Sequence, residues 1–366
     1  MKITALMTAS GVFSKAGAVL IAILFFGLLV MAHEAGHFLF AKLFGVKVNE
    51  FAFGMGPTLF SRKKGETKYA VHLFPIGGFV SMEGEEEDCE GERAFCNKPA
   101  WQRFIIVAAG ATVNLIMGFL IVLVMLAVTT KPDEGIGTTE ILQFREGAVS
   151  SASLQEGDVI KKIGNKHVFS VYDVSYLMSR DSDGVMDITV KRGGETVALK
   201  DVTFQSMKGK DGTNTIIYDF ILRGVNVNFL NVVRYGFDET VTMGRMVWLS
   251  FYDLVTGQYG LSDLSGPIGT VAYVAEAADV TDENWDLSYV LLIMALISVN
   301  IGLFNLFPIP ALDGGRLFFI LIEMVFRKPV PQKYERWVHA AGMVLLLGFM
   351  AVVSLSDILK LIRGEF

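Results

Sequence analysis

Charge and cysteine are both scarce in this sequence. Only 19% of its 366 residues are charged, 52% are hydrophobic, and the mean hydropathy is +0.46. Because soluble domains carry about 25% charged residues, this composition excludes an ordinary soluble domain and indicates a membrane protein. The only cysteines, Cys89 and Cys96, are too few for a disulfide framework. We place both in a cytoplasmic loop and expect them to be unpaired.

A basic surplus is missing as well, and we expect no cleavable leader. The net charge of −6 offers no basic face, so we expect no nucleic-acid partner. The first apolar run continues into a long helical stretch, with no small-residue cleavage site followed by a polar start of a mature chain. We therefore expect this run to stay as a spanning helix rather than to be removed as a signal peptide.

Four apolar regions are long enough to cross a bilayer, which takes about 20 residues. They cover approximately residues 16–44, 104–128, 287–326 and 338–362. The third region is longer than one span needs, and it is interrupted by Pro308, Pro310 and the turn Asp313-Gly314-Gly315. Broken helices at membrane depth are tolerated only where they face protein or a water-filled cavity, so this break indicates a functional site.

Positive residues are concentrated in two loops. Nine Lys or Arg lie between Lys42 and Arg103, and four more lie between the third and fourth apolar regions. Positive residues in short loops mark the cytoplasmic side of a membrane protein. We therefore expect both termini and the region 129–286 to lie outside the cytoplasm.

Two segments outside the spans are expected to form strands. Residues 46–82 alternate apolar with small or polar side chains around a turn at 63–66, which is typical of a β-hairpin. Residues 134–205 contain short strands, a helix around 171–179 and a turn at 192–195, enough for a small sandwich or barrel. Residues 206–286 read as an amphipathic region lying on the outer membrane surface.

The motif HEAGH, residues 33–37, interrupts the first apolar region. Two histidines four residues apart project from one face of a helix and can share one Zn²⁺, with the glutamate between them as general base. A chance occurrence of this pattern is the alternative. Charged side chains inside a membrane helix cost about 2.5–3.5 kcal/mol each, and a bound cation removes that problem. We therefore predict zinc ligands at His33 and His37 and a base at Glu34.

A catalytic zinc takes three protein ligands and keeps one position for water. We predict Asp313 as the third ligand, because it lies in the break of the third region beside two glycines that allow close backbone approach. Capping of the following helix is its alternative role. His339, at the start of the fourth region, is the weaker candidate, and the remaining histidines are His72 in the hairpin and His167 in the 134–205 region.

Two asparagines lie in the same apolar regions. The amide of Asn305, eight residues before Asp313, is suited to hold a substrate carbonyl or a developing oxyanion. Alternatively, it bonds to the helix backbone at the kink. Asn114 lies between Gly110 and Gly118 in the second region, where we expect packing or an interhelix hydrogen bond rather than catalysis.

Together these motifs resemble the site-2 protease family of intramembrane zinc metalloproteases, of the bacterial regulator-of-sigma-E-protease type. The similar stretches follow the family order over nearly the whole chain: HEAGH (33–37), FGMGP (53–57), PIGGFVSMEGE (75–85), SGPIG (265–269) and NLFPIPALDGGR (305–316). The resemblance implies that His33, His37 and Asp313 bind zinc, that Glu34 is the catalytic base and that Asn305 positions substrate. It also implies that the hairpin 46–82 re-enters the membrane.

Residues 134–205 resemble a PDZ domain of the bacterial protease kind, through residues 147–165. PDZ domains take extended peptides at a sheet edge, so a peptide ligand is expected, and a spacer role is the alternative. In the family this domain is thought to filter substrates by size. Many members carry two tandem PDZ domains and this chain has room for one, so their anti-sigma-factor pathway cannot be assumed here.

The expected fold is a multi-pass α-helical membrane protein with about four transmembrane helices. It comprises an N-terminal core (1–128), the PDZ domain (134–205), the surface region (206–286) and a C-terminal core (287–366). The resemblance implies a zinc-dependent endopeptidase in the bacterial cytoplasmic membrane, with the PDZ domain outside and the active site towards the cytoplasm. Its substrates would be transmembrane segments, of anti-sigma-factor or remnant-signal-peptide type, in regulated intramembrane proteolysis. The alternative is a non-proteolytic metal-binding membrane protein, either a transporter or a PDZ-based receptor.

Overall fold

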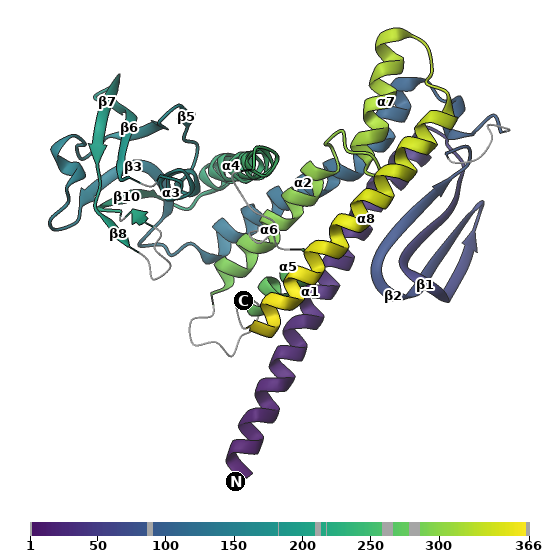
Figure 1. Cartoon of the computed structure of the whole chain (residues 1–366), viewed down its shortest axis with the longest axis horizontal. Helices are drawn as coiled ribbons and strands as arrows, with labels where there is room; N and C mark the ends of the chain where they lie inside the picture. The colour runs from purple at the N-terminus through teal and green to yellow at the C-terminus, as the bar shows by residue number, and fades with distance from the viewer. Residues whose placement is uncertain are drawn as a thin grey trace. The chain divides into compact units, whose positions relative to one another are not determined.

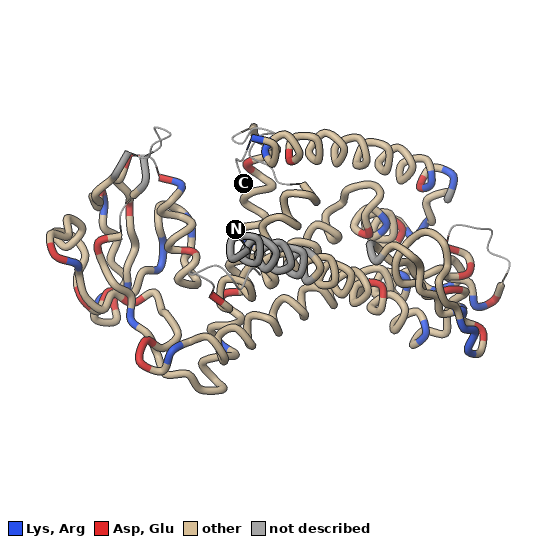
Figure 2. The backbone as a smooth tube through the Cα atoms, turned by 90° about the horizontal axis from the view of Figure 1, so that it is seen from below, with Lys and Arg blue, Asp and Glu red and all other residues tan. Residues whose placement is uncertain are grey.

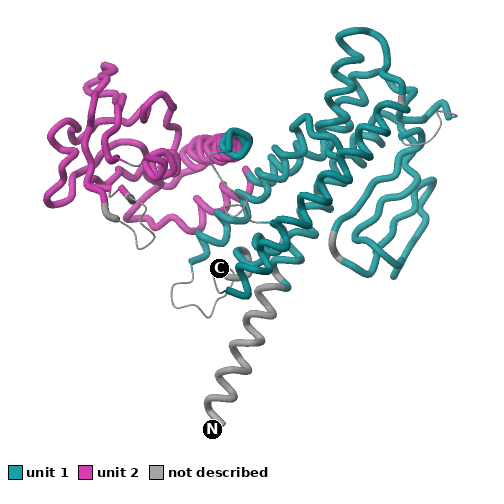
Figure 3. Tube along the Cα trace, in the orientation of Figure 1, with its two compact units in different colours: residues 1–118, 251–366 teal, residues 119–250 magenta. Residues whose placement is uncertain are grey.

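The computed structural model describes residues 2–85, 91–181, 183–208, 214–216, 218–257, 266–277 and 286–363. Two compact units make up the chain, one of residues 1–118 with 251–366 and one of residues 119–250 (Figure 3). The first unit contains the two-stranded hairpin and most of the long apolar helices. The second contains the larger sheet.

Within the part of the chain that the structure describes, four helices are long and apolar enough to cross a membrane, as the sequence predicts. They are α1 (Lys2–Leu43), α2 (Ala100–Thr129), α6 (Leu287–Phe304) and α8 (Gln332–Arg363). In α8 the charged residues lie near the two ends, and the long stretch between them carries none (Figure 2). This distribution suits a helix whose middle lies in hydrocarbon and whose ends reach water.

Small residues allow α2 and α6 to pack closely in the first unit. A Cβ at Gly118 would lie 2.6 Å from Val299 Cγ2, and one at Gly302 would lie 3.0 Å from the carbonyl oxygen of Ala111. The hydroxyl of Ser298 donates to the carbonyl of Asn114 at 2.8 Å. Close backbone contact and an interhelix hydrogen bond are the usual means of helix association in a membrane.

The predicted break in the third apolar region is confirmed. Helix α6 ends at Phe304, and α7 runs from Asp313 to Phe326. The link contains Pro308 and Pro310, which have no backbone N–H to donate. Two residues of α7 are buried in an apolar cluster with α1, α2 and the hairpin; the cluster consists of Ala41, Val46, Val48, Met82, Phe95, Ile106, Val107, Leu317 and Ile320.

The predicted hairpin is formed by β1 (Val48–Lys64) and β2 (Thr67–Met82) in the first unit. It is folded twice, because Phe51 pairs with Tyr69 on one side and with Val80 on the other. The bends contain glycines with positive φ, among them Gly54 at 83° and Gly77 at 86°. The resulting order of segments is 58–64, 67–72, 48–53 and 78–82, so residues 78–82 form one edge.

The second unit contains a six-stranded antiparallel sheet with the path β10-β3-β4-β6-β7. Its members are β3 (Ile136–Phe144), β4 (Val159–Ile163), β5 (Lys166–His167), β6 (Val185–Arg192), β7 (Glu195–Thr203) and β10 (Phe220–Val225). The predicted helix is α3 (Val171–Ser179). Because β10 pairs with β3, the sheet continues beyond residue 205, where we expected the domain to end. A short hairpin, β8 (Ser206–Lys208) with β9 (Asn214–Ile216), precedes β10.

Helix α4 (Phe229–Val255) contacts α3 of the same unit through buried polar groups. The carboxylate of Asp173 accepts from the Thr242 hydroxyl at 2.9 Å and pairs with the guanidinium of Arg245. Nearby, burial raises the pKa of the Glu239 carboxyl to about 8, against a hydrogen bond from Ser170. These contacts lie inside the second unit, and the expected position of 206–286 on the membrane surface stays a prediction.

Helix α5 (Pro267–Ala277) is linked to α8 at its first turn. The buried carboxylate of Asp357 accepts the backbone N–H groups of Gly266 and Gly269, each at 2.9 Å. This satisfies amides that the start of a helix leaves without intrahelical partners.

Our prediction of unpaired cysteines is wrong for Cys96, which is disulfide-bonded. The loop that contains it is folded back on itself, with the Phe95 N–H donating to the Glu83 carbonyl at 2.7 Å. This contact joins residues 83 and 95, on the two sides of the loop. Cys89 lies outside the described residues.

Candidate metal centre

Three side chains converge in the first unit. The Nε2 atoms of His33 and His37, one turn apart on α1, lie 3.2 Å from each other. Asp313, the first residue of α7, places Oδ2 3.0 Å from Nε2 of His33 and 3.2 Å from Nε2 of His37. Both histidines are only 8% exposed. The structure thus brings together the three residues that the sequence predicts as zinc ligands.

The proton on His37 is fixed by a backbone carbonyl. Its Nδ1 lies 2.9 Å from the carbonyl oxygen of Ile106, and because a carbonyl only accepts, Nδ1 carries the hydrogen and Nε2 keeps a lone pair. The facing oxygen of Asp313 is buried and has no hydrogen-bond donor among the described residues. Acceptors that face each other at about 3 Å repel unless a cation lies between them.

For His33, the partner of the Nδ1 atom is the side chain of Asn114 on α2. Its side-chain amide lies 3.3 Å from Nδ1 of His33. An asparagine amide presents either its NH₂ or its carbonyl oxygen by a simple rotation. With the oxygen facing Nδ1–H, His33 also keeps a lone pair at Nε2. Asn114 therefore makes the expected interhelix hydrogen bond, and its partner is a ligand candidate, which the sequence did not indicate.

The three residues fit a zinc ion. Their ligand atoms all lie within 4.8 Å of one another, with separations of 3.0–3.2 Å across the group. Tetrahedral ligands at zinc distances of about 2.0–2.1 Å stand approximately 3.3 Å apart. Two imidazoles and one carboxylate are also a ligand set of catalytic zinc sites that keep a position for water.

Two glycines, one on α1 and one on α2, allow these two helices to lie close to each other. A Cβ at Gly36 would lie 2.6 Å from the carbonyl oxygen of Ala109, and one at Gly110 would lie 2.4 Å from Nε2 of His37. Any larger residue at either position would push the helices or the imidazoles apart. The small residue inside HEAGH thus has a packing reason that is independent of the metal.

The turn before α7 directs the Asp313 side chain to the histidines. The N-cap of α7 is Leu312, which makes no side-chain cap, so the capping role that we kept as an alternative for Asp313 is not seen. A Cβ at Gly314 would lie 1.9 Å from the carbonyl oxygen of Phe307. Only glycine allows the link to fold back this tightly beside the carboxylate.

A cavity of about 830 Å³ opens beside the three residues. Glu34, next to His33 on α1, forms part of the cavity wall. Residues 79–82, from the edge of the hairpin, and residues of α7 and α8 also line the cavity. Two of the wall residues, Glu85 and Arg316, form an ion pair. The predicted base therefore faces a space large enough for a peptide segment and water, next to the candidate ligands.

Asn305 makes the second of the two contacts that we considered for it. It is the C-cap residue of α6, and its side-chain amide donates to the carbonyl oxygen of Ile301 at 3.0 Å. It is not among the described residues of the cavity wall. Its role in positioning substrate stays a prediction.

The other histidines do not join the group of three. His339 lines the cavity, but its Nδ1 accepts the backbone N–H of Ala311 at 3.1 Å. His72 lies near Thr58 within the hairpin, and His167 stacks on Phe169 in the second unit. Among the described residues, Asp313 is thus the side chain that lies within coordinating distance of both imidazoles.

Known proteins match this chain over most of its length. The model of peptidase family M50 matches residues 21–349. A provisionally named zinc metalloprotease of Clostridium acetobutylicum is 34% identical, covering 93% of this chain and 97% of that protein. The regulator of sigma-W protease RasP of Bacillus subtilis is 30% identical, and the similarity covers 93% of this chain and 97% of the RasP chain. A solved PDZ domain of an SdrC-like protein from Listeria monocytogenes covers 24% of this chain at 19% identity, with a TM-score of 0.19.

Proposed function

We propose how this chain, which belongs to peptidase family M50 and is a zinc-dependent intramembrane endopeptidase, carries out its reaction. His33, His37 and Asp313 bind the zinc ion, and Glu34 transfers protons. The observation that carries this assignment is the convergence of three acceptor atoms, 3.0–3.2 Å apart, beside the cavity that Glu34 lines. The family match also decides against the alternative of a non-proteolytic transporter or receptor.

Each residue has a separate task in peptide hydrolysis. When bound, zinc supplies a Lewis acid that polarises a peptide carbonyl and makes a water molecule acidic enough to react near neutral pH. Glu34 takes a proton from the attacking water and delivers a proton to the leaving amine. The carbonyl of Ile106 and the amide of Asn114 hold the two imidazoles in the orientation that leaves their Nε2 atoms for the metal.

The substrate must be extended before it is cut, because a helix already uses its peptide carbonyls in hydrogen bonds. We propose that it pairs with the edge segment 78–82 of the hairpin. Residues 79–82 line the cavity, and a Cβ at Gly78 would lie 3.4 Å from Cγ of Glu34. Strand addition at this edge would place an unwound segment next to the base.

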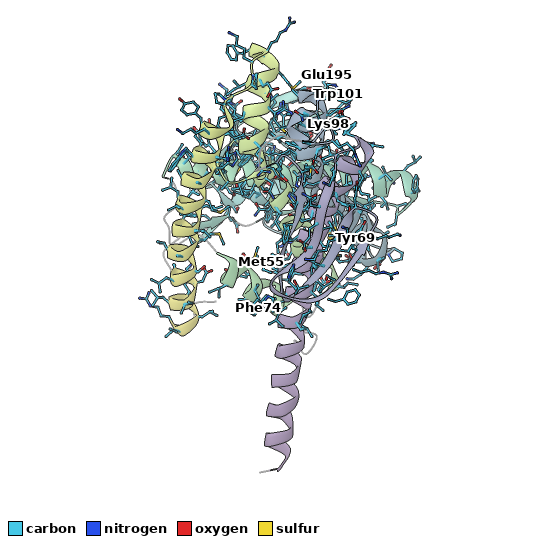
Figure 4. The ribbon with its side chains drawn as sticks, turned by 90° about the vertical axis from the view of Figure 1, so that its right-hand side faces the viewer. Met55, Tyr69, Phe74, Lys98, Trp101 and Glu195 are labelled. Atoms are coloured by element: carbon cyan, nitrogen blue, oxygen red, sulfur yellow. The ribbon has the colours of Figure 1, made fainter. Side chains whose placement is uncertain are left out.

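The hairpin has an apolar surface that supports its entry into the membrane. Met55 and Phe74 are 56% and 55% exposed and lie near the same end of the hairpin (Figure 4). Exposed apolar side chains of this size are unfavourable in water. We propose that this end re-enters the bilayer from the cytoplasmic side, which places the active site towards the cytoplasm and the second unit outside.

The substrates that we propose are transmembrane segments of membrane proteins. RasP of Bacillus subtilis is named as a regulator of sigma-W, which supports an anti-sigma-factor substrate in regulated intramembrane proteolysis, and remnant signal peptides offer the same chemistry. We further propose that the second unit acts as a PDZ domain. Its strand β10 is an edge of the sheet and could receive an extended peptide or exclude bulky substrates.

Glu34→Gln tests this function. We expect purified full-length protein, reconstituted with zinc, to cleave a transmembrane peptide that contains helix-breaking residues, and a chelator to stop it. The variant should keep one zinc per chain and lose cleavage by about 10²–10⁴-fold, the usual contribution of a positioned acid or base. Glu195→Gln, which changes the exposed first residue of β7 (Figure 1 shows β7 beside β6), serves as the matched control. Full turnover in Glu34→Gln would contradict the assignment.

A further inference from the structure

We propose that His339 is a positioning residue, which holds the turn before Asp313 in the conformation that carries the Asp313 carboxylate to His33 and His37. This inference rests on the proposed zinc site. It starts from a backbone feature of the turn: Ala311, two residues before Asp313, has φ of +78°. Residues with a Cβ adopt this left-handed region only rarely, and they stay there when the surroundings over-determine it.

A side chain of α8 supplies that restraint. The backbone N–H of Ala311 donates to Nδ1 of His339 at 3.1 Å, and the contact bridges the link and the fourth apolar helix. The hydrogen bond forms only while the Ala311 N–H points towards α8. It therefore selects the conformation of the turn that leads directly into Asp313.

The same hydrogen bond fixes the proton of His339. Because Nδ1 accepts, Nε2 carries the hydrogen. Neither ring nitrogen then has a lone pair to offer to a metal. This explains why His339, which lines the cavity together with His37, is not one of the ligand histidines. Its Nε2 is buried and has no hydrogen-bond partner among the described residues.

The position of the His339 ring is itself set by close packing. A Cβ at Gly342, one turn further along α8, would lie 2.3 Å from Pro310 Cβ, and one at Gly315 would lie 3.1 Å from Cε1 of His339. The aromatic ring of Phe319 lies with its centroid 6.0 Å from that of His339. Glycines on both sides thus bring α8, the link and α7 within reach of one imidazole.

The experiment compares zinc affinity in four full-length variants by competition with a chromophoric chelator. His339→Phe removes the acceptor, and we expect zinc binding about tenfold to hundredfold weaker, the range for partners that orient metal ligands. His339→Asn offers Oδ1 in place of Nδ1 and should stay close to wild type. Ala311→Gly should also bind zinc with the wild-type affinity. In the double variant that combines His339→Phe with Ala311→Gly, part of the lost affinity should return, because glycine adopts φ of +78° without a restraint.

Two further readouts separate positioning from a general structural or substrate-binding role. At saturating zinc, His339→Phe should regain most of the kcat that it lacks at limiting zinc. His167→Phe, in the second unit, should change neither quantity. If the phenyl ring prevents folding, as judged by the thermal midpoint in detergent, His339→Leu makes the same comparison.

Three results would overturn the inference: unchanged zinc affinity in His339→Phe, an equal loss in His339→Asn, or a low kcat that saturating zinc does not restore. A wild-type protein that binds no zinc would instead overturn the proposed zinc site. The two failures are therefore distinguishable.

Discussion

At the scale of single residues, the glycine beside the two zinc imidazoles matters as much as the ligands. A Cβ at Gly110 would lie 2.4 Å from Nε2 of His37 and 2.9 Å from Nε2 of His33. We expect Gly110→Ala to displace both imidazoles and to abolish stoichiometric zinc, measured by elemental analysis of the purified protein. Gly348→Ala, with no atom within 4 Å of the new methyl group, is the control. A full zinc content in Gly110→Ala would show that the helices can separate without cost to the site.

The ligand residues could be predicted from the sequence because their spacing and chemistry are local. Two histidines at helical spacing and a carboxylate in a helix break are visible without a structure. Asn114 as the partner of His33, and the restraint of Ala311 by His339, were not predictable in this way. Each depends on which residues of distant helices come into contact, and a single sequence does not give that register.

At the scale of elements, the two edges of the hairpin sheet make different predictions. We expect Val80→Pro, on the edge segment 78–82 beside Glu34, to lower kcat/KM at least about tenfold with the zinc content unchanged, because proline removes a backbone donor needed for strand addition. Phe60→Pro changes the opposite edge, residues 58–64, and should leave kcat/KM near the wild-type value. Equal losses in both variants would mean that the hairpin supports the fold rather than binding substrate.

Helix α4 gives the second unit a pH-dependent stability. The pKa of the Glu239 carboxyl is raised from 4.5 to about 8, first by burial and also by the charges of Asp173 and Asp238. The folded state therefore keeps this proton up to a higher pH than the unfolded state. We therefore expect the part of the stability that depends on Glu239 to be largest below pH 4.5 and to fall as the pH rises from 4.5 to 8. The loss is on the order of 5 kcal/mol.

Glu239→Gln measures this dependence directly. The amide keeps the shape of a protonated carboxyl and cannot ionise. We expect the thermal midpoint of the full-length protein in detergent to exceed that of the wild type increasingly as the pH rises from 5 towards about 8, and the two to converge at low pH. Parallel curves across this range would show that Glu239 ionises freely in the folded protein.

The elements themselves were largely predictable, but not all of their pairings. Prolines and glycines located the break between α6 and α7, and alternation located β1 and β2. The double pairing of Phe51 with Tyr69 and Val80 was missed. Alternation tells which residues share a face of a strand, but it doesn't tell how a long hairpin bends back on itself.

At the scale of the whole molecule, the proposed membrane orientation can be tested by labelling. In a variant with both native cysteines replaced by serine, we expect Glu195→Cys to react with a membrane-impermeant thiol reagent added outside intact cells, because we place the second unit outside. Lys328→Cys, in the positively charged loop between α7 and α8, should react only after the membrane is opened. The reverse pattern would invert the topology and place the active site on the other side.

The division of the chain was predictable from composition, while the extent of the second unit was not. Apolar length located the four helices that could cross a membrane. The sheet, however, takes in β10 because it pairs with β3, far back in the sequence. Strands that pair across long separations leave no local sign of the pairing, so the predicted end at residue 205 fell short of the sheet.

X-ray absorption at the zinc edge of the purified full-length protein tests the central claim most directly. We expect one zinc per chain, bound by two imidazole nitrogens and by oxygen, and loss of that signal in His33→Ala and in Asp313→Ala. A zinc bound by sulfur, or one that remains fully bound in those variants, would contradict a site built from His33, His37 and Asp313.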